Sequence, residues 1–472
     1  MYSRFYLSVL LISGLLVLAY LGFTAYDSFM PEWMSYQFEY RDYLTKNAKD
    51  DAAKKLARAL PLEFTQVYLG EMNKVDRCTN CHMGVENPLM ENTRLPYKKH
   101  SGNYLVNHPV DKFGCTVCHE GQGSATNTKE AHGKGHDTHW DTPILPLAYV
   151  QSSCAQCHDT NMLSKSGGDK VAKGEALFME KGCKGCHKLK GVGGDLGKPL
   201  DKVGRQPIAY FTMKHIVGEH TVFNWLKQHF DDPRAIAPDS AMKVKLGEGE
   251  ADLLTTYMLT LRPDEKPKSY RRINFNEPPV QNGETLYKSY CSACHGDGKK
   301  SLYDEVFKRT VPAIMNPSLL KVMDDTNLDK ILKEGRTGTQ MTAWKKTAAG
   351  LTDEQIKEIV TYMAANRPAD RPEPFRLAEF KGDLSHGKEV YDLRCAVCHG
   401  TNGKGGEDML GVSLRSKVVQ KMIDPEVLAI TVRDGRADTP MPAFGSDPFG
   451  MSKQDIADVV AYIKDFQSGG GK

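Results

Sequence analysis

The feature that most constrains this chain is a pentapeptide, Cys-x-x-Cys-His, which occurs six times and uses all 12 cysteines. With 12 Cys and 15 His among 472 residues, random placement would give only about 0.01 such motifs. The copies are Cys78-Thr-Asn-Cys81-His82, Cys115-Thr-Val-Cys118-His119, Cys154-Ala-Gln-Cys157-His158, Cys183-Lys-Gly-Cys186-His187, Cys291-Ser-Ala-Cys294-His295 and Cys395-Ala-Val-Cys398-His399. Chance does not explain the repeat.

The motif has a mechanical logic for attaching haem. Two thiols three positions apart can form thioether bonds to the two vinyl groups, and the adjacent His becomes the proximal iron ligand. Disulfide pairs or zinc sites are the alternative, but a His after every pair and the absence of a spare cysteine disfavour them. The sequence therefore predicts six covalently bound haem c groups with proximal ligands His82, His119, His158, His187, His295 and His399.

The amino-terminal stretch from Phe5 to Tyr26 has 22 residues without a charge. As a helix it would cross a hydrocarbon core of about 30 Å. A cleaved signal peptide is the alternative, but the apolar run is longer than usual and no Ala-x-Ala site follows it. We expect an uncleaved transmembrane anchor at residues 1–27. Arg4 before the span and Asp27 and Glu32 after it favour an inside amino terminus, which places the haem domains on the periplasmic side of the inner membrane.

Composition adds two bounds. A chain of 472 residues is long enough for three or four domains. Its hydrophobic residues make up only 40% of the chain, so the apolar surface of the haem groups would add to the core of each domain. The net charge of +3 suggests neither a nucleic acid nor a strongly acidic partner.

Residues 28–75 read as a helical connector, with one helix from Pro31 to about Leu60. Its aromatic residues fall on a single stripe, which suits an interfacial belt, a contact with a partner subunit, or packing against the chain's own haem region. The stripe consists of Trp33, Tyr36, Tyr40 and Tyr43.

Residues 76–165 form an irregular module with three of the haem motifs and a surplus of histidine. Five His lie between its motifs, so we expect at least two of its irons to have two His ligands. The preferred distal ligands are His108, His132 and His139, His100 is a close contender, and His136 ranks last because it lies so near His139.

From Lys170 onward the chain repeats a pattern three times. Each unit opens with a short helix whose Gly precedes the haem motif by eight or nine residues, and that Gly should permit a close helix crossing. Each unit closes with an amphipathic helix, with Thr352 and Ser452 as N-caps of the second and third, followed by Gln355 and Asp455 three positions on. The opening glycines are Gly174, Gly283 and Gly387.

These three units resemble class I monohaem cytochrome c domains, with bounds of 166–265, 278–368 and 380–472. The resemblance implies that a Met before the last helix supplies the sixth iron ligand, at Met242, Met341 and Met441. Thr342 and Lys243 replace the Pro that usually follows this Met in the second and first units. In the first unit the rivals are Met213, His215, His220 and His229.

Two Pro-rich, charged segments separate these units, Arg262 to Pro279 and Asn366 to Phe380, and they should act as semi-rigid spacers. The tail at Gly469–Lys472 should be disordered. The expected fold is mainly α: a transmembrane helix, an irregular trihaem module and three tandem class I cytochrome c domains.

The trihaem stretch has a resemblance of its own, carried by Val75-Asp-Arg before Cys78, by residues 108–123, by Ala131-His132-Gly133 and by His139-Trp140. It is similar to multihaem cytochrome c subunits that accompany cytochrome b in bacterial quinol-oxidising complexes. The resemblance implies cytochrome b-type and iron–sulfur subunits as partners, and a soluble or membrane electron acceptor.

The order of ligands predicts a direction for electrons. A thioether ligand stabilises reduced iron, so His/Met haems have higher potentials than bis-His haems. Electrons should enter at the membrane-proximal module and move outward through the three later domains. We expect an electron-transfer subunit without catalytic residues of its own. The alternatives are a multihaem reductase or peroxidase, which needs an open iron position, and a stand-alone membrane-tethered shuttle.

Overall fold

The computed structural model describes residues 2–133, 140, 142–262, 282–336, 339–405, 410–416, 418–446 and 450–466. This part of the chain is mainly helical, as the sequence predicts. The candidate ligands His136 and His139, the first linker after Arg262 and the C-terminal tail lie outside the described residues. Two small antiparallel sheets pair β1 (Val67–Leu69) with β2 (Lys74–Asp76), and β3 (Leu302–Asp304) with β4 (Arg309–Val311).

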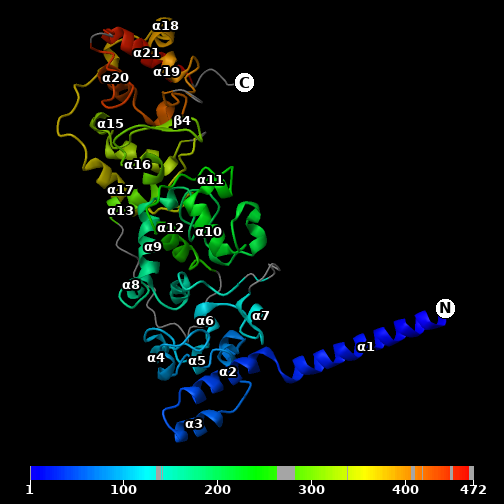
Figure 1. Cartoon of the computed structure of the whole chain (residues 1–472). Coiled ribbons are helices and arrows are strands. Elements are labelled where there is room, and N and C mark those ends of the chain that lie inside the picture. The colour runs from blue at the N-terminus through cyan, green and yellow to red at the C-terminus, as the bar shows by residue number, and fades with distance from the viewer. Residues whose placement is uncertain are drawn as a thin grey trace. The chain divides into compact units, whose positions relative to one another are not determined.

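The first helix, α1 (Tyr2–Phe29), extends from the start of α2 as one long straight element (Figure 1). Its segment Arg4–Tyr26 has a mean hydropathy of 2.2 and is not buried by the rest of the chain. A helix of this length and composition fits membrane anchoring.

The prediction of one helix from Pro31 to Leu60 is wrong, because the structure has two, α2 (Glu32–Lys46) and α3 (Asp51–Arg58). Local capping explains the break. The Asn47 side-chain amide donates to the Tyr43 carbonyl at 2.8 Å, which closes α2. The Asp50 carboxylate accepts the Ala53 N–H at 2.7 Å, which starts α3.

The aromatic stripe on α2 packs on the chain itself. Tyr40 is buried, and its hydroxyl accepts the Asn87 side-chain amide at 2.8 Å. The Tyr36 hydroxyl lies 3.0 Å from Thr128 Oγ1. Of the three roles considered for the stripe, these contacts favour packing against the haem-motif region.

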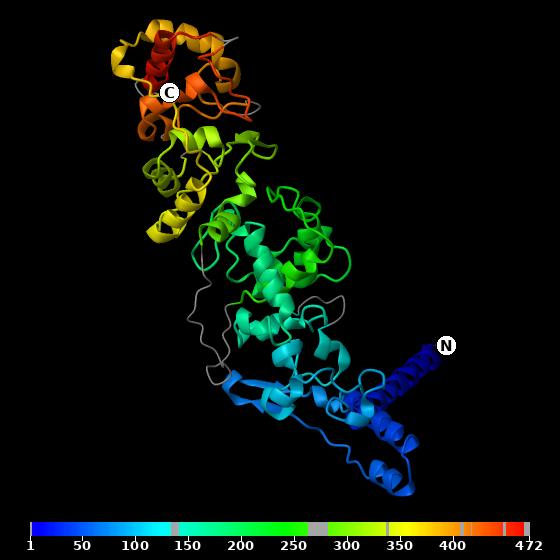
Figure 2. The same cartoon turned by 90° about the vertical axis from the view of Figure 1, so that its left-hand side faces the viewer.

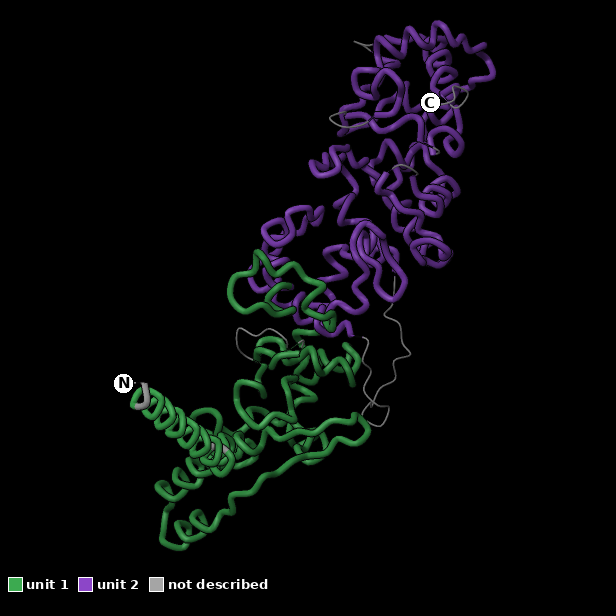
Figure 3. The backbone as a smooth tube through the Cα atoms, turned by 90° about the vertical axis from the view of Figure 1, so that its right-hand side faces the viewer, with its two compact units in different colours: residues 1–171, 204–225, 264–273 green, residues 172–203, 226–263, 274–472 purple. Residues whose placement is uncertain are grey.

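The described chain forms two compact units (Figure 3). Unit 1 contains residues 2–171 and 204–225, and unit 2 contains 172–203, 226–262 and 282–466, apart from the undescribed positions. The predicted first cytochrome c domain therefore contributes to both. Its 204–225 segment packs within unit 1, where Arg205 pairs with Glu120 at 3.2 Å.

Unit 1 beyond α3 is built from short elements, as its lack of hydrophobic periodicity predicts. None of those described exceeds seven residues. They are η1 (Gly70–Met72), η2 (Cys78–Asn80), η3 (Pro88–Met90), α4 (Tyr104–Asn107), α5 (Val110–Phe113), α6 (Thr116–His119), α7 (Thr128–His132), η4 (Val150–Gln156), α8 (Thr160–Leu163), η7 (Ile208–Tyr210) and η8 (Met213–His215).

Unit 2 contains three pairs of crossing helices, and Figures 1 and 2 show the third pair in orange and red. An added Cβ would lie 2.3 Å from the Leu253 carbonyl at Gly174, 2.1 Å from that of Glu358 at Gly283 and 2.1 Å from that of Asp458 at Gly387. The predicted role of these glycines in close crossing is confirmed. The pairs are α9 (Asp169–Glu180) with α12 (Glu250–Met258), α13 (Gly283–Tyr290) with α17 (Asp353–Ala364), and α18 (Leu384–Arg394) with α21 (Lys453–Asp465).

Further elements lie along the chain between the two helices of each pair. Both predicted capping boxes are present, at Thr352 with Gln355 and at Ser452 with Asp455. Two separate apolar cores surround the second and third pairs. The remaining elements are η5 (Cys183–Gly185), η6 (Val203–Arg205), α10 (Val222–Asp231), α11 (Pro233–Ile236), α14 (Ser292–His295), α15 (Pro317–Val322), α16 (Asp325–Glu334), η10 (Leu377–Glu379), α19 (Ala396–His399), the π-helix η11 (Val418–Met422) and α20 (Pro425–Asp434).

The second predicted spacer, residues 366–380, is fixed at several points. The Arg367 guanidinium donates to the carbonyls of Leu320 and Met323, each at 3.0 Å. Phe375 is 3% exposed and belongs to the core around α18 and α21. The segment is therefore held to the neighbouring helices at both Arg367 and Phe375, which agrees with the stiffness expected from its prolines.

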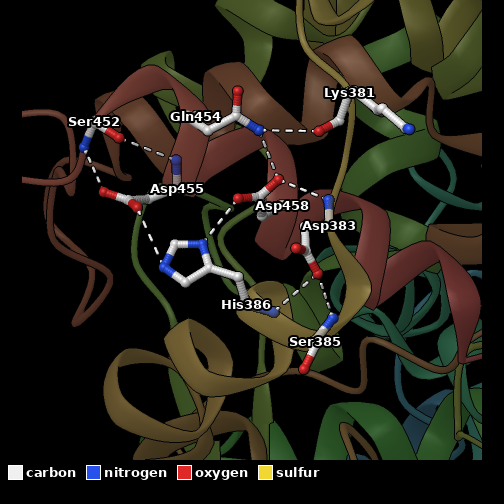
Figure 4. Close-up of polar contacts among 8 residues, drawn as sticks. All are labelled: Lys381, Asp383, Ser385, His386, Ser452, Gln454, Asp455 and Asp458. Carbon is white, nitrogen blue, oxygen red and sulfur yellow. Dashed lines mark hydrogen bonds and ion pairs between the residues drawn. The ribbon is translucent and has the colours of Figure 1, made fainter.

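A polar cluster joins α18 to α21 (Figure 4). His386 Nδ1 lies 2.8 Å from the Asp458 carboxylate, which is almost fully buried and also accepts the Asp383 N–H and the Gln454 amide at 2.8 Å. The hydrogen bond to Asp458 raises the pKa of His386. Burial alone would raise the pKa of Asp458, but hydrogen bonds from Asp383, His386 and Gln454 hold it below its ordinary value.

This cluster predicts a pH-dependent stability. Because the pKa of His386 is raised on folding, its contribution is fully present below the unfolded pKa of about 6.5 and is lost as pH rises through the folded value. Asp458, Asp455 and Glu389 are the acidic groups that act on it. Thermal unfolding of the full chain should show a difference between wild type and His386→Gln that shrinks as pH rises from about 6 to about 9. A difference that stays constant over this range contradicts the prediction.

Candidate haem-binding sites

All six Cys-x-x-Cys-His motifs adopt the same backbone turn. In each, the His N–H donates to the carbonyl of the first Cys at 2.9–3.0 Å. Residues at i, i+3 and i+4 of such a turn lie on one face, so both thiols and the imidazole project to the same side. All 12 cysteines are described and none forms a disulfide, which fits thioether attachment and gives no support to disulfide pairing.

The proximal histidines of unit 2 are held in one tautomer. Nδ1 donates to a backbone carbonyl in each, that of Lys198 for His187 at 2.8 Å, of Pro312 for His295 at 3.1 Å and of Val412 for His399 at 2.8 Å. The Nε2 lone pair is then available to iron. Burial lowers the pKa of all three, that of His295 to about 4, so the imidazoles stay in the neutral, metal-binding form.

In unit 1 each proximal imidazole faces a second imidazole. Ring centroids are 6.2 Å apart for His82 and His132, 6.0 Å for His119 and His100, and 6.0 Å for His158 and His108. Two imidazoles on opposite sides of one metal, each at a usual bond length of about 2.0 Å, have centroids about 6 Å apart. The three pairs therefore fit three irons with two His ligands each.

Two of the distal rings are oriented in the same way as the proximal ones. His100 Nδ1 donates to the Ser101 carbonyl at 2.8 Å, and His108 Nδ1 to the Tyr104 carbonyl at 3.0 Å. The sequence ranked His100 behind His139, but within the described residues it is His100 that faces His119. The pairings join residues up to 50 positions apart, and no local pattern announces them.

Asp76 joins the first two motifs, a role that the sequence analysis did not assign. It is 1% exposed, and its Oδ2 accepts the backbone N–H groups of Cys115 and Thr116, each at 2.8 Å, and the Thr116 hydroxyl at 3.0 Å. Its Oδ1 accepts the Cys78 N–H at 3.2 Å. The available signal in the sequence was an acidic residue two positions before the first motif.

Met341 and Met441 occupy matching loops. The Met341 N–H donates to Thr339 Oγ1 at 3.1 Å and its carbonyl accepts the Arg336 N–H at 2.9 Å. Met441 has the same two contacts, with Thr439 at 3.3 Å and Arg436 at 3.0 Å. Both side chains are half-buried against their cores. The loop tolerates Thr342 in place of Pro, since the same backbone hydrogen bonds form without it.

The first cytochrome c unit has two candidates for the sixth ligand. The Met242 N–H donates to Ser240 Oγ at 3.2 Å, which resembles the other two Met loops. His229, on α10, is the second candidate, because burial and the nearby His187 ring lower its pKa to about 4. His215 and His220 are exposed, as expected of surface residues.

Comparison with known proteins agrees with this geometry. The family "Cytochrome c" matches residues 171–262 and 384–467, and the family "Cytochrome C oxidase, cbb3-type, subunit III" matches 278–363. A cbb3-type cytochrome c oxidase subunit CcoP of Azospirillum is 27% identical, over 48% of this chain and 72% of its own. A cytochrome bc1 complex cytochrome c subunit of Corynebacterium efficiens is 25% identical, over 48% and 74%.

A shorter relative, a cytochrome c-553-like protein of Synechocystis, is 30% identical over 89 residues, which are 18% of this chain and 70% of the relative. Cytochrome c domains carry covalently bound haem c, and this chain has several attachment motifs of identical geometry. The chain belongs to the cytochrome c family, as a multihaem electron-transfer protein.

Proposed function

We propose that this chain is a hexahaem cytochrome that relays electrons from a quinol-oxidising membrane complex, through bis-His haems, to His/Met haems and an outer acceptor. The observation that carries the proposal is the set of three facing imidazole pairs in unit 1. An iron with two protein ligands has no open position for a substrate, so these sites suit electron transfer and not bond chemistry.

Each haem supplies a one-electron iron couple, and the chain supplies attachment, axial ligands and surroundings. In unit 1 the proposed ligand pairs are His82 with His132, His119 with His100, and His158 with His108. In unit 2, His295 pairs with Met341 and His399 with Met441, while His187 pairs with Met242 or His229. The covalent attachment points are Cys78, Cys81, Cys115, Cys118, Cys154, Cys157, Cys183, Cys186, Cys291, Cys294, Cys395 and Cys398.

Two observations support unit 1 as the place where electrons enter the chain. Unit 1 begins with the apolar helix α1, and two of the relatives are named as a subunit of a cbb3-type cytochrome c oxidase and a subunit of a cytochrome bc1 complex. We therefore place the chain in the inner membrane, with its haem units on the periplasmic side and a cytochrome b-type subunit as donor. Bis-His irons near the membrane and Met-ligated irons beyond it give electrons a downhill path outward.

Purification of the native complex in mild detergent tests the proposal. A cytochrome b subunit should co-purify with the chain, and the fully reduced protein should not bind carbon monoxide in stoichiometric amount. Isolation of the chain alone would favour a stand-alone shuttle. Stoichiometric carbon monoxide binding at one haem would favour a reductase or peroxidase.

The ligand pairs give a sharper prediction. His132→Ala should leave the iron bound by His82 without a sixth ligand, so that one haem becomes high-spin and binds carbon monoxide. Absorption spectra and titration with carbon monoxide measure the change. His220→Ala, at an exposed position, is the control and should keep the wild-type spectrum. A low-spin spectrum without carbon monoxide binding in His132→Ala contradicts the pairing.

A further inference from the structure

The fourth and fifth attachment motifs, both in unit 2, meet directly. An added Cβ at Gly182, just before Cys183, would lie 2.7 Å from Ser292 Oγ and 2.8 Å from the Ala293 nitrogen. At Gly185 it would lie 2.9 Å from the Tyr290 carbonyl oxygen. These distances are too short for a side chain, so only glycine allows the two loops to approach this closely.

The approach brings together one cysteine from each motif. The Cys186 and Cys294 side chains interact with each other across the two motifs. Cys186 belongs to the motif of His187, and Cys294 to that of His295. Because each sulfur would join a haem edge to the protein, two neighbouring sulfurs would hold two haem edges close together.

One basic side chain links the two loops, and a second forms an ion pair with a residue that follows the fifth motif. Lys184 is 9% exposed, and its ammonium donates to the Tyr290 hydroxyl at 3.1 Å and lies 5.2 Å from the centre of that ring. A buried lysine is costly unless it has partners, so this contact between the two motifs is specific. Lys243, which stands where Pro usually follows the ligand Met, pairs with Asp304 at 3.1 Å.

The same device recurs in unit 1. The ligand atoms of Asp76, Cys78 and Cys115 all lie within 4.8 Å of one another, which places a sulfur of the first motif beside a sulfur of the second. There the buried Asp76 binds the backbone of both motifs in place of the lysine contacts. In each unit, therefore, two motifs that follow one another in the sequence place one cysteine sulfur of the first beside one cysteine sulfur of the second.

We propose that the contact between Cys186 and Cys294 is the crossing point at which one electron passes directly from the haem held by His187 to the haem held by His295. The donor iron is oxidised from Fe(II) to Fe(III), the acceptor iron is reduced from Fe(III) to Fe(II), and no bond or proton moves. Gly182, Gly185 and Lys184 are positioning residues for this step. The inference rests on the proposed function, since it requires haem at both motifs.

Gly182→Ala tests the contact in the full-length, haem-loaded protein. Its matched control is Gly249→Ala, because both glycines have a positive φ, 68° and 77°, but Gly249 has no atom within 4 Å of an added Cβ. The first variant should separate the loops, weaken the magnetic coupling between two ferric haems in electron paramagnetic resonance, and slow electron equilibration after photoreduction. The control should keep the wild-type coupling and rate.

A milder variant guards against misfolding of Gly182→Ala. Tyr290→Phe removes only the hydroxyl that Lys184 binds, and it should reduce the same coupling with all haems retained. Wild-type coupling and rate in both variants would overturn the inference. The haem content of the wild-type protein separates the two proposals. A wild-type protein without haem at motif four or five would overturn the proposed hexahaem function. A wild-type protein with six haems but no magnetic coupling between those two haems would overturn only the crossing point.

Discussion

Asp76→Ala should destabilise the haem-rich part of unit 1 by about 3–5 kcal/mol. The substitution removes the acceptor for the N–H groups of Cys78, Cys115 and Thr116, and the Asp76 side chain that accepts them is only 1% exposed. Denaturant unfolding followed through the absorption of the bis-His haems measures the loss.

The nearby Asp111 provides the control for this prediction. It lies in the first turn of α5 and its side chain is exposed, so Asp111→Ala should change the stability by only about 0.5 kcal/mol. Asp76→Asn should fall between the two, because an amide keeps one acceptor oxygen but not the second. Equal stabilities of Asp76→Ala and Asp111→Ala would show that Asp76 does not hold the two motifs together.

Gly283→Ala should destabilise unit 2 by about 2–3 kcal/mol even though alanine is the better helix former. Helix propensity alone favours alanine by about 1 kcal/mol. The new methyl group, however, would lie 2.1 Å from the Glu358 carbonyl oxygen and 2.6 Å from Tyr362 Cβ. Since the nearest atom is backbone, α17 itself must move away from α13, and overpacking of this kind outweighs the gain in propensity.

Gly247→Ala is the matched control for the helix crossing. Its added Cβ meets only the Glu250 side chain, at 3.6–3.9 Å, and its stability should stay within about 0.5 kcal/mol of wild type. Thermal unfolding of the two variants, followed by circular dichroism, provides the comparison. A Gly283→Ala protein as stable as the control would mean that the two helices do not cross as closely as described.

The sequence was sufficient for features that depend on neighbouring residues. The six motifs, the opening and closing helices and the capping boxes at Thr352 and Ser452 each require residues no more than four positions apart. The break between α2 and α3 is also local, but the sequence analysis did not identify Asn47 and Asp50 as caps within the predicted single helix.

Features that depend on chain folding could not be predicted in the same way. His132 faces His82 from 50 positions away, and His100 precedes the His119 that it faces, so neither spacing nor order identifies the pairs. The contact between Cys186 and Cys294 joins motifs more than 100 residues apart, and Lys243 pairs with Asp304, which follows the fifth motif. The sequence alone showed only that Lys243 departed from a familiar pattern.

The pinned segment at residues 366–380 has a consequence for how electrons leave the chain. A domain on a free linker finds its partner by diffusion, and its effective concentration depends on the length of the tether. Here Arg367 is bound to the Leu320 and Met323 carbonyls, and Phe375 is buried in the next core. Few residues of this linker are therefore free to let the last domain move. The second and third helix pairs are therefore joined without a free tether, and under the proposed function an electron would pass between their haems without a docking event within the chain.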